Sequence, residues 1–304
     1  TYKAIGGEVH RLRELSSVDI YESLRSEPVR ALMVKNGPMT RIHELVREIL
    51  DEVLSHDLLT GLTSIKSADA DIYQHSIDVC AISIVVGRTV GLDKKRLRQL
   101  ATGALLHDVG SIFLESHGRD AAYIVQHTKL GYELLRNNDD PDILAPHVAY
   151  EHHEHQDGPG LPRGLRGDNM IERHHGTSQT VPTLIGEIAA IANAYDNLLS
   201  GRDGGEPMTP DLALQHIREN AGSTFNRAIV AAFLRVTPVF PKGTEVIIRA
   251  GTHKGYTAIV AEVHPGALDR PIITLTHDAH NHPIEPRLID LLDTPNTDIR
   301  AKGI

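Results

Sequence analysis

The chain reads HHEHQDGPGLP from His152 to Pro162, and two further polar motifs precede this stretch. A His-Asp pair stands at His107 and Asp108, and His127 lies between that pair and the stretch. The sequence holds 19 histidines but only one cysteine. Imidazole and carboxylate groups without thiolates suit iron, manganese or a similar ion at a hydrolytic or oxygen-handling centre, rather than a structural zinc site built from cysteines. These residues therefore predict a bound metal.

The composition is that of an ordinary globular protein. Its 304 residues, of which 40% are hydrophobic and 23% charged, suffice for one main core with one or two small satellites. The net charge of −9 argues against a broad surface for duplex nucleic acid, which would need clustered Lys and Arg. Cys80 stands alone, which predicts a buried thiol in a reducing compartment. The longest apolar run is far shorter than the roughly 20 residues of a membrane-spanning helix. We therefore expect a cytoplasmic protein without membrane insertion.

The residue patterns divide the chain into three regions. Residues 1–56 form an N-terminal helical region, a candidate for regulation, and its last helix carries Thr40 as the expected N-cap and an apolar face from Ile42 to Leu54. Residues 57–236 read as an almost wholly helical metal-binding domain. Residues 237–304 read as a small β-rich tail packed on this core, because short runs rich in β-branched residues alternate there with Gly and Pro. The expected fold class is mainly α.

Caps and breakers place the elements within these regions. The expected helices cover 68–90, a segment from the cap Asp93 to His107, a segment opened by Asp140-Pro141 that leads into His152, Thr183–Ser200, and a segment that starts at Thr209-Pro210 and stops near Gly222. The expected strands cover 246–249, 256–263 and 272–275. The pattern in the middle region is that of four or five long helices around one polar cluster.

Seven candidate ligands come from these separate helices. Asp71 and His75 are four residues apart, so both side chains leave one face of their helix. Neighbouring His107 and Asp108 diverge by about 100° on a helix, so a shared centre requires the helix to end there, and Gly110 supplies a stop. The full set is Asp71, His75, His107, Asp108, His127, His152 and His153. Seven ligands exceed the need of one ion, which favours two ions with Asp108 as the bridging carboxylate.

The ordered motifs HDVG at 107–110, HTKLG at 127–131 and HHExxDGxGxP at 152–162 resemble the HD-GYP family, a branch of the HD phosphohydrolases. The similarity continues through residues 192–196 and 200–202 and into the β tail at Pro241, Gly243 and 289–291, so it covers roughly residues 57–292. It implies an HD-GYP helical bundle core that holds two or three metal ions, commonly iron. It also implies hydrolysis of the bacterial messenger cyclic di-GMP to pGpG or GMP.

Carried over by position, the resemblance implies the metal ligands His75, His107, Asp108, His127, His152 and His153, with His107 and Asp108 at the catalytic centre. Asp71 stands where some members place an acidic ligand for an additional metal, and it is otherwise a surface acid. Asn193 replaces an Asp ligand of the family; it either coordinates through its amide oxygen or is a buried amide bonded to a neighbouring ligand. We expect two transition-metal ions, iron before manganese, rather than three.

Several positions depart from the family pattern. Ser111 replaces the usual Lys after HD-x-Gly, Leu161 replaces the Tyr of Gly-Tyr-Pro, and His155 replaces a basic residue. Residues 170–182, which include His174 and His175, look inserted, either as a loop or as a lid over the pocket. For substrate binding, Arg202 is a candidate phosphate contact or else a helix-end residue, and Lys129 and Arg163 are further candidates. Glu154 and Asp157 are expected to orient the motif loop or the ligand imidazoles.

Three functional classes follow from these residues. The first is a two-metal phosphodiesterase acting on cyclic di-GMP, in which water activated between the ions attacks phosphorus. The second is a weak or inactive family member that senses a nucleotide or docks a signalling protein, which the three departures Ser111, Leu161 and Asn193 favour. The third is a di-iron oxygenase of HD type, against which the motif loop and the β tail count. The expected partners are a cyclic dinucleotide and signalling proteins.

Overall fold

The computed structural model describes residues 38–55, 72–114, 120–136, 144–172, 180–202 and 205–303. Within them lie eight α-helices, namely α4 (Pro38–Ser55), α6 (Ile72–Thr89), α7 (Lys94–Leu105), α8 (Ala121–Arg136), α9 (Ala145–Glu151), α10 (Leu184–Ser200), α11 (Pro210–Glu219) and α12 (Arg227–Leu234), and the short 3-10 helix η1 (Val109–Phe113). Some of the expectations fall outside the described residues, namely those on Asp71, Asp140, Pro141, His174, His175 and the boundary at 56–57.

The helix ends follow the expected capping chemistry, with one exception. The Asp93 side chain accepts a hydrogen bond of 2.8 Å from the Arg96 backbone N–H and starts α7. Thr183 caps α10 in the same way, and Gly201 ends it with a φ of 66°. The expected N-cap at Thr40 is wrong: α4 begins at Pro38, because proline is tolerated in the first turn of a helix, where its missing N–H has no intrahelical acceptor.

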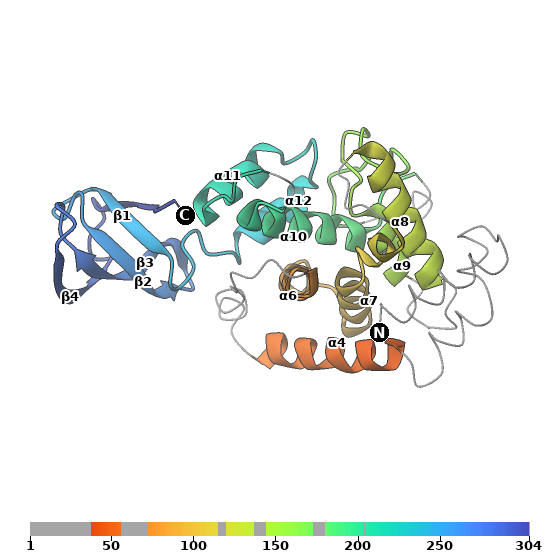
Figure 1. Cartoon of the computed structure of the whole chain (residues 1–304), viewed down its shortest axis with the longest axis horizontal. Helices are drawn as coiled ribbons and strands as arrows, with labels where there is room; N and C mark the ends of the chain where they lie inside the picture. Colours follow the sequence, from red (N-terminus) through yellow and green to blue (C-terminus); the bar gives the residue numbers. More distant parts are fainter. Residues whose placement is uncertain are drawn as a thin grey trace.

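The main hydrophobic core lies in the helical part (Figure 1). Its centre is formed by α6 and α10, and α4, α7, α11 and α12 pack around them. Val46 of α4 is fully buried there, as the apolar face of that helix predicted. Cys80 is also fully buried and directs its thiol at the Ala101 carbonyl over 3.4 Å. Burial raises the pKa of this thiol to about 12, so the expectation of a buried cysteine is confirmed.

A smaller core joins η1, α8 and α9 through Leu106, Val109, Leu130, Leu134, Leu135 and Ala149. Glycine is required where η1 meets α8: a Cβ at Gly110 would lie 1.9 Å from the His127 carbonyl oxygen. Because Gly110 lacks that atom, the turn that carries Asp108 packs directly against the helix that carries His127. The same packing therefore brings two of the motifs together.

The C-terminal part is a five-stranded antiparallel sheet with its own core, at the end of the molecule away from α8 (Figure 1). Its strands are β1 (Glu245–Ala250), β2 (Thr257–His264), β3 (Ala267–His277), β4 (Pro283–Asp290) and β5 (Asp298–Ala301), in the order β4-β3-β2-β1-β5. The three expected strands are confirmed. Two strands, β4 and β5, were not predicted. β4 contains Pro283 and Pro286, which the edge of a sheet tolerates.

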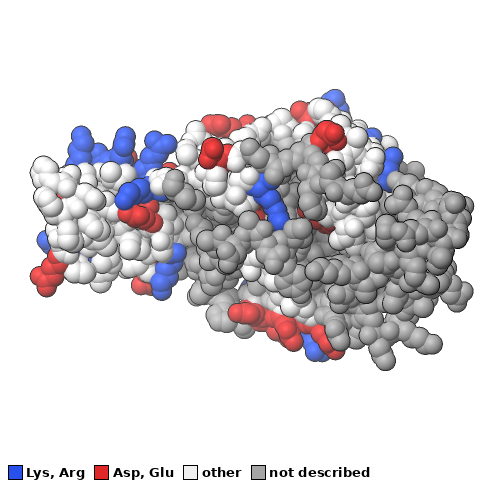
Figure 2. Space-filling model, in the orientation of Figure 1, with Lys and Arg blue, Asp and Glu red and all other residues white. Residues whose placement is uncertain are grey.

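The two parts differ in the charge of their surfaces. In the view of Figure 2, acidic side chains lie along α4, where Glu44, Glu48, Asp51 and Glu52 are exposed, whereas most basic side chains visible on this face lie over the sheet.

Among the helices that the structure describes, none is both long and apolar enough to cross a membrane. The structure is thus mainly α-helical with a small antiparallel sheet, as the sequence predicted.

Candidate metal centre

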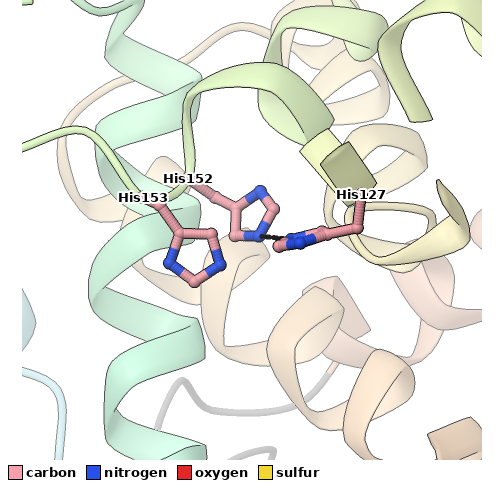
Figure 3. A group of neighbouring side chains, drawn as sticks. All are labelled: His127, His152 and His153. Carbon is pink, nitrogen blue, oxygen red and sulfur yellow. Dashed lines mark hydrogen bonds between the residues drawn. The ribbon is translucent and has the colours of Figure 1, made fainter. Parts of the chain in front are cut away.

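Six of the expected ligands meet in two groups. The first contains His75 of α6 with His107 and Asp108 from the turn between α7 and η1; the second contains His127 of α8 with His152 and His153. Within each group one ligand atom per residue lies within 4.8 Å of the others. Figure 3 shows the second group, in which His152 and His153 approach from the turn after α9 and His127 from the neighbouring helix.

The end of α7 allows His107 and Asp108 to reach the same place. The helix stops at Leu105, and η1 begins at Val109, so the two residues do not follow helical geometry. The expectation that the helix must end there for both side chains to share one centre is confirmed. His107 is fully buried, and the Asp108 side chain is 35% exposed, which leaves the carboxylate at the accessible side of the cluster.

Four of the imidazoles are held from behind through Nδ1. The Nδ1 atoms of His107 and His127 lie 2.7 Å and 3.0 Å from the carbonyl oxygens of Ala104 and Tyr123. His152 Nδ1 lies 3.1 Å from two carbonyl oxygens of α9, and His75 Nδ1 lies 2.6 Å from the Asp196 carboxylate. Each of these partners can only accept a hydrogen bond, so each Nδ1 carries the proton and each Nε2 presents a lone pair.

These lone pairs face one another. His75 Nε2 lies 3.2 Å from His107 Nε2, and His127 Nε2 lies 3.4 Å from His152 Nε2. With Nδ1 as the donor, neither pair can form a hydrogen bond between its Nε2 atoms, and the two lone pairs repel. Two nitrogens that bind one ion at about 2.1 Å lie about 3.0–3.4 Å apart, which matches both distances. The donor set therefore fits a transition metal in each group.

Asp108 lies between the groups and offers one oxygen to each. Its Oδ1 is 3.5 Å from both His127 Nε2 and His152 Nε2. Its Oδ2 is 3.5 Å from His107 Nε2 and 3.9 Å from His75 Nε2. This is the geometry expected of a carboxylate that bridges two ions.

The electrostatics favour the protonation states that bind metal. Burial, reinforced by neighbouring imidazoles, lowers the pKa of His107 to about 3 against the opposing pull of Asp108, and lowers the pKa of His127 to about 4. The pKa of His153 is also held well below its usual value by burial and by His152. Burial opposes ionisation of Asp108, but attraction to the surrounding histidines holds its pKa well below the usual range. Neutral imidazoles and an ionised carboxylate are the forms that coordinate cations.

Sequence reasoning missed the role of Asp196. Its carboxylate fixes the ring of His75, and a carboxylate behind a ligand imidazole sets the tautomer and raises its basicity. The sequence spacing could have indicated this role, because Asp196 follows Asn193 by three residues on α10 and therefore lies on the same face of that helix. Asn193 is buried, and its Oδ1 accepts a hydrogen bond of 3.2 Å from Asn197 Nδ2. A ligand role for Asn193 stays a prediction, and Asp71 lies outside the described residues.

The motif loop after His153 is closed by Glu154, as expected. Its two oxygens accept hydrogen bonds of 2.7 Å from the backbone N–H groups of Arg163 and Leu165. The Arg163 guanidinium donates to the buried Glu151 over 3.1 Å and lies 5.6 Å from the centre of the Tyr150 ring. Arg163 thus makes contacts within the protein, and its binding of substrate stays a prediction.

The two other candidate phosphate contacts lie in different settings. Arg202 directly follows Gly201, the C-cap of α10. Lys129 lies on α8 two residues after His127, which turns it about 200° around the helix from that ligand. Substrate binding by Arg202 or Lys129 stays a prediction.

Comparisons with known proteins agree with this arrangement. The family model described as "HD domain" matches residues 72–198. The cyclic di-GMP phosphodiesterase PA4108 of Pseudomonas aeruginosa is 26% identical over 266 residues, which are 84% of this chain and 60% of that protein. The cyclic di-GMP phosphodiesterase response regulator RpfG of Xanthomonas campestris is 31% identical over 161 residues, which are 50% of this chain and 39% of that protein. The chain thus spans about half the length of these relatives.

A solved structure shows a similar fold. It is that of Bd1817, described as an HDG"Y"P protein from Bdellovibrio bacteriovorus, with a TM-score of 0.50 and 18% identity over 76% of this chain and 68% of the other. The HD match contains all six residues of the two groups. The chain carries an HD domain over residues 72–198, and its fold is similar to that of the Bdellovibrio protein.

Proposed function

We propose that this protein is a phosphodiesterase with two metal ions, most naturally iron, that hydrolyses cyclic di-GMP to pGpG or GMP. The single observation that carries the proposal is the position of Asp108, whose two oxygens each face one group of histidines. His75 and His107 would hold one ion, and His127, His152 and His153 the other. Relatives at 26% and 31% identity that are named cyclic di-GMP phosphodiesterases support this substrate.

The residues of the chain prepare the site for a phosphodiester. When bound, the ions supply a water of lowered pKa and positive charge opposite the phosphoryl oxygens. The anchored imidazoles fix the positions of the two groups before substrate arrives, so no reorganisation is needed during the reaction. Asp108 holds the groups at a fixed separation and remains on the exposed side. Arg202, which follows the C-cap of α10, would be the cation that meets a phosphate, as the family resemblance implies.

Hydrolysis by protein with a defined metal content tests the proposal. The protein is loaded with iron or manganese, and linear products are measured by chromatography from cyclic di-GMP and, in parallel, from a mixed cyclic GMP-AMP dinucleotide. We expect conversion of cyclic di-GMP and a loss of more than about a hundredfold in the Asp108→Asn variant, because bridging charge is removed. Asp269→Asn is the matched control, since this side chain is exposed on β3, in the sheet.

The same measurements distinguish the enzyme from the second candidate function, a nucleotide sensor. Ser111 and Leu161 in place of the family's Lys and Tyr favour this alternative. Metal-loaded protein that binds cyclic di-GMP without producing pGpG would establish the sensor and overturn the enzyme. Protein that retains no transition metal would overturn both.

A further inference from the structure

We propose that Glu151 is a positioning residue that fixes the second metal group relative to the first. This inference rests on the proposed function, because it concerns how the chain holds two ions at a set separation. Glu151 is the last residue of α9 and is followed directly by His152 and His153. Its side chain is 1% exposed, and it belongs to neither metal group. The carboxylate therefore acts from behind the ligands.

One carboxylate oxygen of Glu151 joins the end of α9 to the start of α10. Oε2 accepts a hydrogen bond of 2.7 Å from the backbone N–H of Thr183, the residue that caps α10. Gly186 allows this close approach, since a Cβ there would lie 3.1 Å from Glu151 Cβ and 3.3 Å from Oε2. A carboxylate at the N-terminus of a helix is also favoured by the helix dipole. The end of α9 is thus held against the first turn of α10.

Helix α10 carries this contact to the first metal group. Near its other end lies Asp196, whose carboxylate is 2.6 Å from His75 Nδ1. The 13 residues from Thr183 to Asp196 span about 20 Å of α-helix. Because a continuous helix keeps its ends at a fixed distance, a single element connects the ligand turn after α9 with the anchor of His75. This connection lies behind the ligands, whereas Asp108 lies between the groups on the exposed side.

The other carboxylate oxygen of Glu151 holds the motif loop. Oε1 accepts a hydrogen bond of 3.1 Å from Arg163 Nη1, and His147 Nδ1 lies 3.2 Å from the same oxygen. The backbone N–H of Arg163 donates to Glu154 over 2.7 Å. Glu151 and Glu154 stand immediately before and after the two ligand histidines. Arg163 is therefore bound to the chain on both sides of the turn that carries these ligands.

These contacts require a carboxylate at this position. The Thr183 N–H and the Arg163 guanidinium can only donate hydrogen bonds, and they meet different oxygens of Glu151. An amide has one acceptor oxygen, so Glu151→Gln would turn an NH2 group toward one of the donors and leave that donor without its partner. We expect the end of α9 to shift away from α10 or from the motif loop. His152 and His153 would shift with it.

Metal binding by Glu151→Gln, measured without substrate, tests the assignment. Competition with a chelator should show one iron bound about tenfold more weakly, at the low end of the effect of changing a group behind metal ligands. The other iron should keep its affinity. The iron–iron signal in X-ray absorption of the loaded protein should weaken, because the separation of the two groups is no longer fixed. A role in stability alone would leave both measurements on the folded protein unchanged.

Ile217→Val is the control for stability. Ile217 is fully buried on α11 in the main core, so the shorter side chain lowers the unfolding temperature. None of the partners of Glu151 named above lies on α11. Both iron affinities and the iron–iron signal should stay as in the unaltered protein.

Thr183→Pro tests the same contact from the side of α10. Thr183 has a φ of −66° and a ψ of 148°, which proline adopts readily. The change replaces the N–H that Glu151 accepts with a ring carbon, but it also removes the capping hydroxyl. Thr183→Ala, which loses only that hydroxyl, is therefore the matched control. Thr183→Pro should weaken the same iron by a similar factor, and Thr183→Ala should not.

The outcomes separate this inference from the proposed function. Unchanged iron affinities and an unchanged iron–iron signal in Glu151→Gln and Thr183→Pro would show that Glu151 does not position the group. Equal losses of both irons, similar losses in Ile217→Val, or failure of both variants to fold would leave Glu151 a role in stability and overturn the inference. If the unaltered protein holds two irons but leaves cyclic di-GMP intact, the proposed function fails, and the metal measurements still decide the role of Glu151. If it holds fewer than two irons, both proposals fall.

Discussion

The helical part and the sheet both place histidines beside carboxylates, but only the helical part arranges them as a metal site. His75 is buried, and the Asp196 carboxylate holds its Nδ1 at 2.6 Å, so its Nε2 is directed at His107. His264, in the sheet, uses Nε2 itself to contact Asp290 at 3.0 Å, and both side chains are partly exposed. The difference teaches that burial and anchoring of the ring, rather than the number of histidines, create a ligand.

The largest expected effect comes from removing one histidine from each part. His107→Ala should reduce hydrolysis by more than about a hundredfold and remove about half of the bound metal, because the first group loses a ligand that no neighbour replaces. His264→Ala should change neither quantity measurably. Metal content is measured by elemental analysis after dialysis, and hydrolysis by product formation.

The comparison would break if the two variants behaved alike. Full metal content in His107→Ala would show that the first group does not bind an ion. Loss of metal in His264→Ala would place an ion at the sheet instead.

A smaller effect is expected when the anchors are changed. Asp196→Asn should weaken metal binding by about 10- to 100-fold, the usual effect of removing a carboxylate behind a ligand imidazole. Asp290→Asn removes the corresponding partner of His264 and should leave metal affinity unchanged. Metal affinity is obtained by competition with a chelator, and equal affinities in the two variants would contradict the role given to Asp196.

The sequence predicted most of the centre because its ligands lie in short motifs. The need for the helix to end at His107 and Asp108 follows from helix geometry, and the bridging position of Asp108 follows from the number of ligands and the two oxygens of a carboxylate. Asp196 was missed because it acts through His75, and this contact forms only when α10 packs against α6. Its spacing of three residues from Asn193 was the available sign of a shared helix face.

The fold shows the same division between local and tertiary information. Caps at Asp93 and Thr183 are local and were predicted correctly. The strand β4 was missed because its two prolines argue against a strand, and only its place at the sheet edge makes them acceptable. The ligand role of Asn193 and the domain boundary at 236–237 remain predictions.

The smallest effect concerns the pH dependence of stability. Asp78, buried on α6, has its pKa raised from 3.8 to about 7, first by burial and further by Asp196, while a hydrogen bond from Gln74 opposes the rise. The folded state therefore holds a proton that the unfolded chain loses near pH 4, so stability present at low pH falls as the pH rises from about 4 to about 7.

Asp78→Asn should remove much of that fall. We expect the variant to be more stable than the unaltered protein by about 1–2 kcal/mol at pH 8, after allowance for solvent screening, and little different near pH 4. Urea unfolding at both pH values measures this. An equal change at the two pH values would show that Asp78 is ionised in the fold.

The most direct test of the central claim is an anomalous diffraction map of crystals grown with iron. The account predicts two peaks, one within coordination distance of His75 and His107 and the other within coordination distance of His127, His152 and His153, with one oxygen of Asp108 on each. A single peak, peaks away from Asp108, or no peak in crystals grown with excess metal would contradict it.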